Sequence, residues 1–172
     1  WIAHIKTLGG ERKYVEPAKG TVNPRVFIDR LAKKMPANVT VVADVGQNQI
    51  WTCTEYKFRK EGRLLTSGGM GTMGYSVPAA IGAKMADNSR ATVAICGDGA
   101  FQMSFMELAT AVQFGVDIKV VVMTNNRLGM VRELQTNGYH DRQTAVFLDG
   151  SPDFIKLAEA YGIPAMRVYD DD

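Results

Sequence analysis

The chain has 172 residues, which is the length of one domain with a sizeable core. Its 46% hydrophobic and 22% charged residues are ordinary for a soluble globular protein, and no apolar run approaches the ~20 residues of a membrane span. The net charge is +2, and the densest basic run, residues 55–63, also carries two glutamates, so a solvated surface explains it better than a nucleic-acid site.

Residues 1–22 are mixed and glycine-rich, and the sequence predicts a linker or arm from a preceding domain. One domain is expected to fill residues 23–172. Its first element is a helix at residues 24–35, because Asn23 is a suitable N-cap and Pro24 suits the first helical position.

Apolar runs of strand length then alternate with helical patterns. The expected order is strand 39–46, a short strand 63–66, a helix from Pro78 to 86, strand 91–96, helix 103–115, strand 118–124, helix 151–162 and strand 163–168. Strands without polar alternation indicate a mainly parallel sheet with helices on both faces, which is a three-layer, doubly wound α/β domain. Ligands of such sheets bind at the carboxyl ends of the strands.

Cys96 lies within the apolar run 91–96, so we expect a buried core thiol. It and Cys53 make no disulfide framework, which favours a reducing, cytoplasmic setting.

The stretch SGGMGTMG, residues 67–74, has the G-x-G-x-x-G spacing of a dinucleotide-binding loop. The preceding strand 63–66 is short, and a helix that begins at Pro78 would not meet a pyrophosphate directly. The next suitable acidic residue, Asp98, comes later than the expected interval of about 20 residues. A nicotinamide-dependent oxidoreductase is therefore a minor alternative.

Polar residues follow two successive buried strands. Asp98, between two glycines, follows strand 91–96, while Asn125 and Asn126 follow strand 118–124. Each motif alone is explained more simply as a tight turn or a polar loop. The strand ends of a parallel sheet converge, however, so the two motifs together favour a ligand-binding site. Carboxylate, amide and carbonyl oxygens suit Mg²⁺, and a helix just beyond Asp98 favours phosphate. The sequence has no Cys/His spacing for zinc.

Five segments carry a family resemblance: DVGQNQIW, TSGGMGTMGYSVPAAIGA, GDGAFQM, NNRLGMV and SPDFIKLAEAYGI. Together they resemble the C-terminal, thiamine-diphosphate-binding domain of the acetohydroxyacid synthase (acetolactate synthase) catalytic subunit. The resemblance runs from about Asn23 to Val168. GDG followed by NN would alone indicate only the thiamine-diphosphate superfamily, so another 2-ketoacid decarboxylase or carboligase is the nearest alternative.

The resemblance implies a magnesium site and a cofactor cradle. Asp98, the side chain of Asn125 rather than Asn126, and the backbone carbonyl of Arg127 would bind Mg²⁺. Gly71 would present its backbone to the aminopyrimidine, and Met73 would hold the cofactor in a bent conformation. The full set of implied cofactor contacts is Gln47, Asn48, Gly71, Met73, Gly97, Gly99, Ala100, Leu128, Gly129 and Met130.

The family decarboxylates pyruvate and joins the product to a second 2-ketoacid, for branched-chain amino acid biosynthesis. The resemblance implies thiamine diphosphate and Mg²⁺, with FAD in the full-length enzyme, a dimer or tetramer, and a possible regulatory small subunit. The activating glutamate and the FAD-binding domain belong to parts outside residues 1–172. We therefore expect no catalytic residue here and no activity from this chain alone.

Two positions depart from the family pattern. Asn48 stands where most relatives have histidine, and Leu134 stands where a tryptophan often lines the substrate pocket. The second difference puts the usual acceptor preference in doubt. The polar stretch 132–147 is predicted to be either a lid over the cofactor or a surface excursion.

Overall fold

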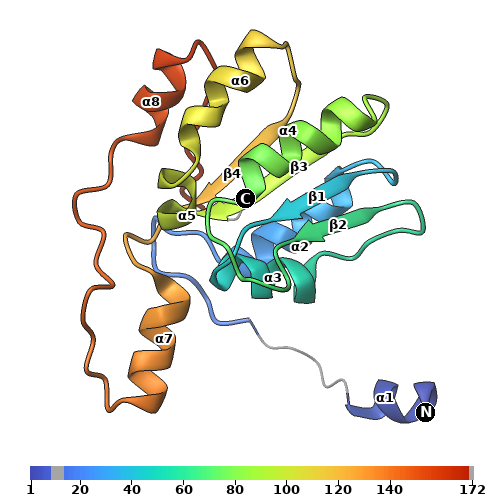
Figure 1. The fold of residues 1–172 in the computed structure, drawn as a ribbon. Helices are drawn as coiled ribbons and strands as arrows, with labels where there is room; N and C mark the ends of the chain where they lie inside the picture. Colours follow the sequence, from blue (N-terminus) through green and yellow to red (C-terminus); the bar gives the residue numbers. More distant parts are fainter. Residues whose placement is uncertain (9–13, 171–172) are drawn as a thin grey trace.

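The computed structural model describes residues 1–8 and 14–170, in which an α/β body is built around one sheet (Figure 1). The described elements are α1 (Ile2–Leu8), α2 (Pro24–Lys34), β1 (Thr40–Ala43), α3 (Gln47–Glu55), β2 (Arg63–Thr66), α4 (Ser76–Ala86), β3 (Thr92–Gly97), α5 (Asp98–Gln102), η1 (Phe105–Glu107), α6 (Leu108–Gln113), β4 (Lys119–Met123), α7 (Gly129–Gly138) and α8 (Phe154–Ala160).

The sheet has four parallel strands in the order β2-β1-β3-β4. The chain passes from β1 outward to β2, then returns beyond β1 to β3 and continues to β4. The carboxyl ends of β1 and β3 therefore border the point where the order reverses, which is the usual ligand position of such sheets. In the register, Ala43 lies opposite Ile95, and Gly97 lies opposite Met123.

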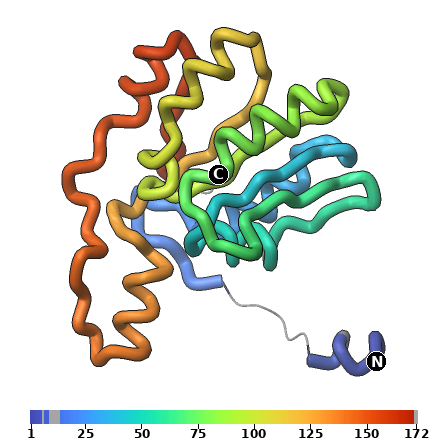
Figure 2. The backbone as a smooth tube through the Cα atoms, viewed as in Figure 1, coloured from blue at the N-terminus to red at the C-terminus, as the bar shows by residue number. Residues whose placement is uncertain are grey.

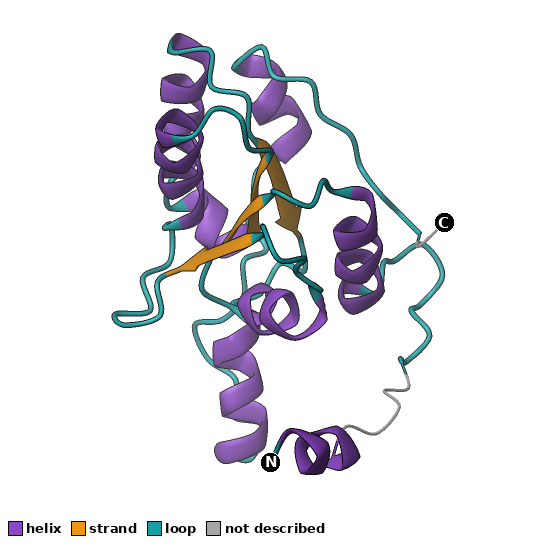
Figure 3. Cartoon of the chain, turned by 90° about the vertical axis from the view of Figure 1, so that its right-hand side faces the viewer, coloured by secondary structure: helices purple, strands orange, loops and turns teal. Residues whose placement is uncertain are grey.

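Helices cover both faces of the sheet, as Figure 3 shows from the side. On one face, Ile28 of α2 packs with Val41 and Ile95 in a cluster that includes residues of α3. On the other face, Ile81 of α4 packs with Cys96 and with side chains of α6 and α8. Neighbouring strand residues point to opposite layers. The predicted three-layer α/β fold is confirmed.

Most predicted elements are confirmed with small shifts at their ends. The short strand at 63–66 is present as predicted, and the other three confirmed strands are β1, β3 and β4. The side chain of Asn23 accepts the Arg25 N–H at 3.0 Å, so the predicted cap of α2 is present. Asp153 caps α8 in the same way, through the N–H of Ile155 at 2.9 Å.

Three predictions need correction. The helix expected at 103–115 is instead the short η1 followed by α6, with the separate helix α5 before it, because Ser104 has a φ of −145° that no helix accommodates. Helix α4 begins at Ser76, two residues before the predicted Pro78. Residues 163–168 form no strand, although the sequence predicts one.

The failure of the strand at 163–168 has a physical explanation. A strand needs a hydrogen-bonded neighbour, and in the described chain no backbone hydrogen bond joins this segment to β4. Pro164 has no N–H to donate, and Met166 is 84% exposed. Arg167 instead forms an ion pair with Asp153 at 2.5 Å, which holds the segment near α8.

The predicted arm contains the short helix α1, which lies apart from the α/β body in Figure 2. Closer to the body, Asn23 donates to the carbonyl of Val15 at 2.8 Å, and the hydroxyl of Tyr14 donates to Glu55 at 3.2 Å. None of the helices within residues 1–8 and 14–170 has the length and apolar character needed to cross a bilayer.

Candidate functional site

Asp98 follows β3 directly and is the first residue of α5. It is 1% exposed, and three backbone N–H groups donate to its carboxylate. Oδ1 accepts from Gly99 at 2.8 Å, while Oδ2 accepts from Asn125 at 3.0 Å and from Asn126 at 2.6 Å. One side chain thus joins the end of β3 to the turn that follows β4, as the strand-end argument predicted.

The 125–127 turn has a defined shape. Asn125 Oδ1 accepts the N–H of Arg127 at 2.9 Å, and Asn126 has a φ of +54°, a left-handed conformation that asparagine tolerates better than most residues. The Asn125 amide lies beside Gly129, where an added side chain would also overlap the amide oxygen of Gln47. Three predicted contacts, Gln47, Asn125 and Gly129, therefore lie together.

A later segment covers this turn from outside. Leu128 donates to the carbonyl of Val146 at 2.9 Å, and Leu148 donates to that of Asn126 at 2.9 Å, which frames an antiparallel bridge. Arg127 lies over the ring of Phe147, 4.5 Å from its centre. This guanidinium also forms an ion pair with the 76% exposed side chain of Asp149 at 2.9 Å. Part of the predicted lid or excursion, residues 132–147, is thus helix α7, and its end is the returning segment that forms this isolated bridge.

Asn48 and Gln47 begin α3 at the carboxyl end of β1, but they face different neighbours. Asn48 is 3% exposed, and its amide nitrogen donates to the carbonyls of Asp44 at 2.8 Å and Ile95 at 3.1 Å. It therefore bridges β1 and β3 at the reversal point. Gln47 donates to Glu133 of α7 at 2.9 Å.

The glycine loop, residues 67–75, approaches the same edge of the sheet. Gly71 has a φ of +63° and open space around it, which leaves its backbone accessible. The methyl end of Met73 lies 3.4 Å from the point where a Cβ on Gly99 would stand. Leu128 and Leu148 approach that point at 2.7 and 3.2 Å, so Gly99 is a glycine because three side chains fill the space.

The remaining predicted contacts lie around these residues. Gly97 ends β3, where an added Cβ would lie 3.5 Å from Oδ1 of Asn48, and Ala100 is 2% exposed within α5. Met130 lies in the first turn of α7, whereas Leu134 on the same helix is 62% exposed.

Asp44 is a site residue that sequence reasoning missed. It is fully buried at the end of β1, where Oδ1 accepts from Val45 at 2.8 Å and Gly74 at 3.0 Å, and Oδ2 accepts from Ser76 at 2.7 Å. The aspartate immediately after an apolar strand, at the same place as Asp98 after β3, is the signal that could have identified it.

The hydrogen bond from Ser76 to Asp44 also bears on whether the G-x-G-x-x-G stretch is a dinucleotide-binding loop. A dinucleotide loop presents the free N–H groups of the following helix to a pyrophosphate. Here the first N–H of α4, from Ser76, is bound by the carboxylate of Asp44. The start of that helix is therefore already occupied by an anionic group of the protein itself.

The oxygen atoms at this edge fit a magnesium ion. Asp98, the Asn125 amide and the Arg127 carbonyl offer hard ligands with a single negative charge, and Mg²⁺ typically adds phosphate oxygens and water to such a set. In residues 14–170 the Arg127 carbonyl accepts no hydrogen bond. Within the same described part, no cluster of three His, Cys, Asp or Glu side chains suits a metal ion.

Cys96 lies two residues before Asp98 in the chain. It is fully buried on β3, and its thiol lies 3.6 Å from the carbonyl of Val121. Burial, together with the nearby carboxylates of Asp44 and Asp98, raises the pKa of the Cys96 thiol far above its usual range. The predicted buried core thiol is confirmed.

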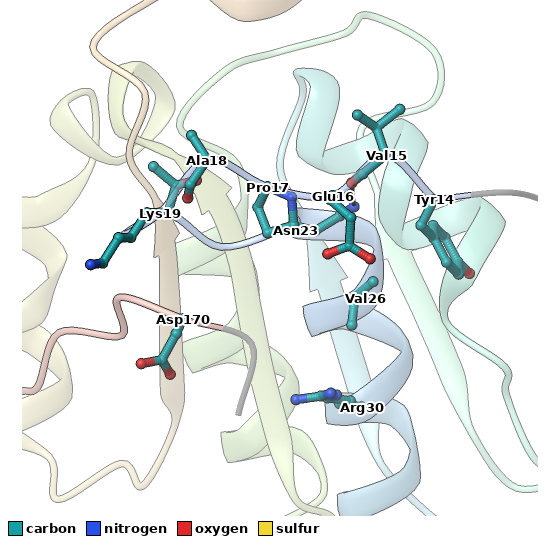
Figure 4. A pocket seen from close by; sticks show the side chains of 12 residues that line it. Tyr14, Val15, Glu16, Pro17, Ala18, Lys19, Asn23, Val26, Arg30 and Asp170 are labelled. Carbon is teal, nitrogen blue, oxygen red and sulfur yellow. Dashed lines mark hydrogen bonds between the residues drawn. The ribbon is translucent and has the colours of Figure 1, made fainter.

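A cavity of about 490 Å³ lies elsewhere, between the arm, α2 and the C-terminal segment (Figure 4). Its charged walls come from Glu16 and Lys19 of the arm, Arg30 of α2 and Asp170. It contains none of the residues predicted to bind magnesium or cofactor.

Comparison with known proteins agrees with this geometry. Residues 44–172 match the family model of the thiamine pyrophosphate enzyme, C-terminal TPP binding domain. The chain is 41% identical over 153 residues to the acetolactate synthase large subunit of Lactococcus lactis, covering 89% of this chain and 27% of that protein. It is 44% identical over 168 residues to a probable acetolactate synthase large subunit of Methanocaldococcus jannaschii, covering 98% of this chain and 28% of that protein.

A third relative, the acetolactate synthase isozyme 3 large subunit of Escherichia coli, is 40% identical over 147 residues, covering 86% of this chain and 26% of that protein. The chain thus spans little more than a quarter of the length of these curated relatives. The match covers β3, β4 and both strand-end motifs, and it begins at Asp44. The chain belongs to the thiamine pyrophosphate enzymes and carries their C-terminal TPP-binding domain.

Proposed function

We propose that this chain supplies the Mg²⁺-diphosphate half of a thiamine diphosphate site in an acetolactate synthase. The observation that carries the proposal is the convergence on Asp98, whose carboxylate holds the 125–127 turn through two backbone N–H groups. This contact brings the turn that contains Asn125 and Arg127 beside the Asp98 carboxylate, which supports a shared magnesium site for the three.

The residues have distinct tasks in this proposal. Asp98, Asn125 and the carbonyl of Arg127 hold Mg²⁺, which in turn holds the diphosphate. Gly71 and Met73 contact the organic part of the cofactor, and the apolar side chains around Gly99 restrict water at that place. When bound, thiamine diphosphate supplies the electron sink for decarboxylation of a 2-ketoacid.

The activity of the whole protein follows from its relatives' names and remains part of the proposal. Its substrates are pyruvate and a second 2-ketoacid, and the product is acetolactate or acetohydroxybutyrate. The full-length enzyme carries FAD, forms a homo-oligomer, works in the cytoplasm and pairs with a regulatory small subunit, which accords with relatives named large subunits. This chain alone is expected to be inactive.

Calorimetric titration tests the binding half of the proposal. Thiamine diphosphate added to the protein with Mg²⁺ should release heat that EDTA abolishes, and at 100 times the dissociation constant it should stabilise the fold by about 2.7 kcal/mol. Asp98→Asn should lose the Mg²⁺-dependent heat. Asp149→Asn, an exposed position in the segment that covers the 125–127 turn, should retain it.

Two results would contradict the proposal. If the full-length protein also gives no Mg²⁺-dependent heat, the diphosphate site is wrong. If the full-length enzyme binds the cofactor but converts pyruvate to acetaldehyde instead of acetolactate, the chain belongs to a decarboxylase.

A further inference from the structure

A buried carboxylate links the glycine loop to the centre of the sheet. Asp44 is fully buried, and its two oxygens accept backbone hydrogen bonds from residues on both sides of Tyr75. Oδ1 accepts from Gly74 at 3.0 Å, and Oδ2 accepts from Ser76 at 2.7 Å. The backbone N–H of Asp44 itself donates to the carbonyl of Ile95 in β3 at 2.8 Å. The residue that carries the carboxylate is therefore fixed to both central strands, β1 and β3.

Burial of an ionised carboxylate is unfavourable unless hydrogen bonds to the charged form compensate for lost water. Three backbone donors meet that need here, including Val45 at 2.8 Å. Hydrogen bonds to a charged acceptor are shorter and stronger than neutral ones, so they fix the positions of the donors. Gly74 and Ser76 are consequently held to the end of β1.

Within the described residues, the backbone hydrogen bonds of the rest of the glycine loop are local. Gly71 donates to the carbonyl of Ser67 at 3.2 Å, and Thr72 donates to the Ser67 hydroxyl at 3.1 Å, both within the loop itself. Met70 is 91% exposed. Apart from the packing of the Met73 side chain near Gly99, the hydrogen bonds that tie this part of the loop to the sheet are the two that Asp44 accepts just beyond it.

We propose that Asp44 is a positioning residue for the cofactor: it sets the distance between the glycine loop and the magnesium-binding turn around Asp98. This inference rests on the function proposed above. Because its side chain is fully buried, Asp44 acts through Gly74 and Ser76 and does not touch the cofactor. Asp44 follows β1 and Asp98 follows β3, and these two strands are hydrogen-bonded neighbours. The glycine loop and the magnesium-binding turn are therefore both held by the same pair of strands.

Asp44→Asn in the full-length enzyme tests the inference. An asparagine keeps one acceptor oxygen and places an NH₂ group toward the other donor, so it can hold Gly74 or Ser76 but not both. We expect the half-saturating thiamine diphosphate concentration to rise about 10-fold, with a lower kcat even at saturating cofactor and Mg²⁺.

Asp153→Asn is the matched control, since Asp153 also accepts two backbone N–H groups at the start of a helix, α8, away from the site. Both N–H groups bond the same oxygen, Oδ1, and asparagine caps helices as well as aspartate, so the control should leave the thermal midpoint, cofactor half-saturation and kcat nearly unchanged. If Asp44→Asn leaves cofactor half-saturation and kcat unchanged, whatever its thermal midpoint, Asp44 has no positioning role and the inference is wrong.

Hydrogen exchange of the wild-type protein without cofactor gives an independent test, which remains available if Asp44→Asn does not fold. The Gly74 and Ser76 amides should exchange much more slowly than that of Gly69 in the same loop. Equal rates would overturn the inference. A wild-type enzyme that needs no thiamine diphosphate would instead refute the proposed function, while the exchange rates would still decide whether Asp44 fixes the loop.

Discussion

Asp98 should stabilise the fold even without a metal ion, and Asp98→Ala tests this in the 172-residue chain. The substitution removes the acceptor of three backbone N–H groups, those of Gly99, Asn125 and Asn126. The Gly99 donor is buried, and an unsatisfied buried donor costs about 1–3 kcal/mol. Asn125 and Asn126 are exposed, so water replaces Asp98 as the acceptor of their N–H groups. Each of these two lost hydrogen bonds therefore costs only about 0.5–1.5 kcal/mol. We expect a total loss of roughly 4 kcal/mol, a large part of the 5–15 kcal/mol typical of a domain.

Urea unfolding in the presence of EDTA measures this loss, because bound metal then makes no contribution. The control is Asp149→Ala, which breaks the exposed ion pair with Arg127 and should cost no more than about 1 kcal/mol. If Asp98→Ala is no less stable than Asp149→Ala, the carboxylate does not brace the turn, and the argument from its three hydrogen bonds is refuted.

Two further predictions concern packing and reactivity. Gly74→Ala should cost about 2 kcal/mol in urea unfolding, because Gly74 has a φ of +84° and a Cβ there would stand 3.0 Å from that of Met103. Gly82→Ala, in open space on α4, should be neutral or stabilising, and equal stability of the two variants would contradict this reasoning. A thiol reagent should label exposed Cys53 and spare buried Cys96 in the native chain. Since burial raises the pKa of Cys96, a change from about pH 7 to about pH 9 should not bring it into reaction, and rapid labelling of both thiols would contradict its burial.

The sequence was most informative where apolar runs are continuous. The buried strands β1 and β3 and the capped helix α2 follow directly from such patterns, as does the convergence of Asp98 with Asn125. Strand-end motifs are predictable because a parallel sheet brings its carboxyl ends to one edge regardless of loop details.

Helices α3 and α7 could not be found in this way. The buried face of α3 is formed by Asn48, Thr52 and Glu55, which have helical spacing but are polar, so apolar periodicity does not reveal it. Helix α7 has no apolar residue after Leu134 and buries none of Met130, Val131 and Leu134, so the polar remainder of the segment favours a loop as readily as a helix.

Asp44 was missed for a different reason. Its partners Gly74 and Ser76 lie 30 and 32 positions further along the chain, and nothing local marks them as donors. The strand predicted at 163–168 failed because strand formation depends on an available neighbour as well as on apolar residues.

The strand order has a consequence for folding kinetics. Every strand pair in this sheet is parallel, and β1 pairs with β3 across a connection that contains all of β2 and α4. Such non-local pairing requires loop closure before its contacts form, which slows folding. Asp44 and Asp98 stand at the ends of these two strands. The distant donors to Asp44, Gly74 and Ser76, lie within the connection between β1 and β3, and those to Asp98, Asn125 and Asn126, follow β4. The cradle therefore forms no earlier than the sheet, and a substitution that delays the pairing of β1 with β3 also delays cofactor uptake.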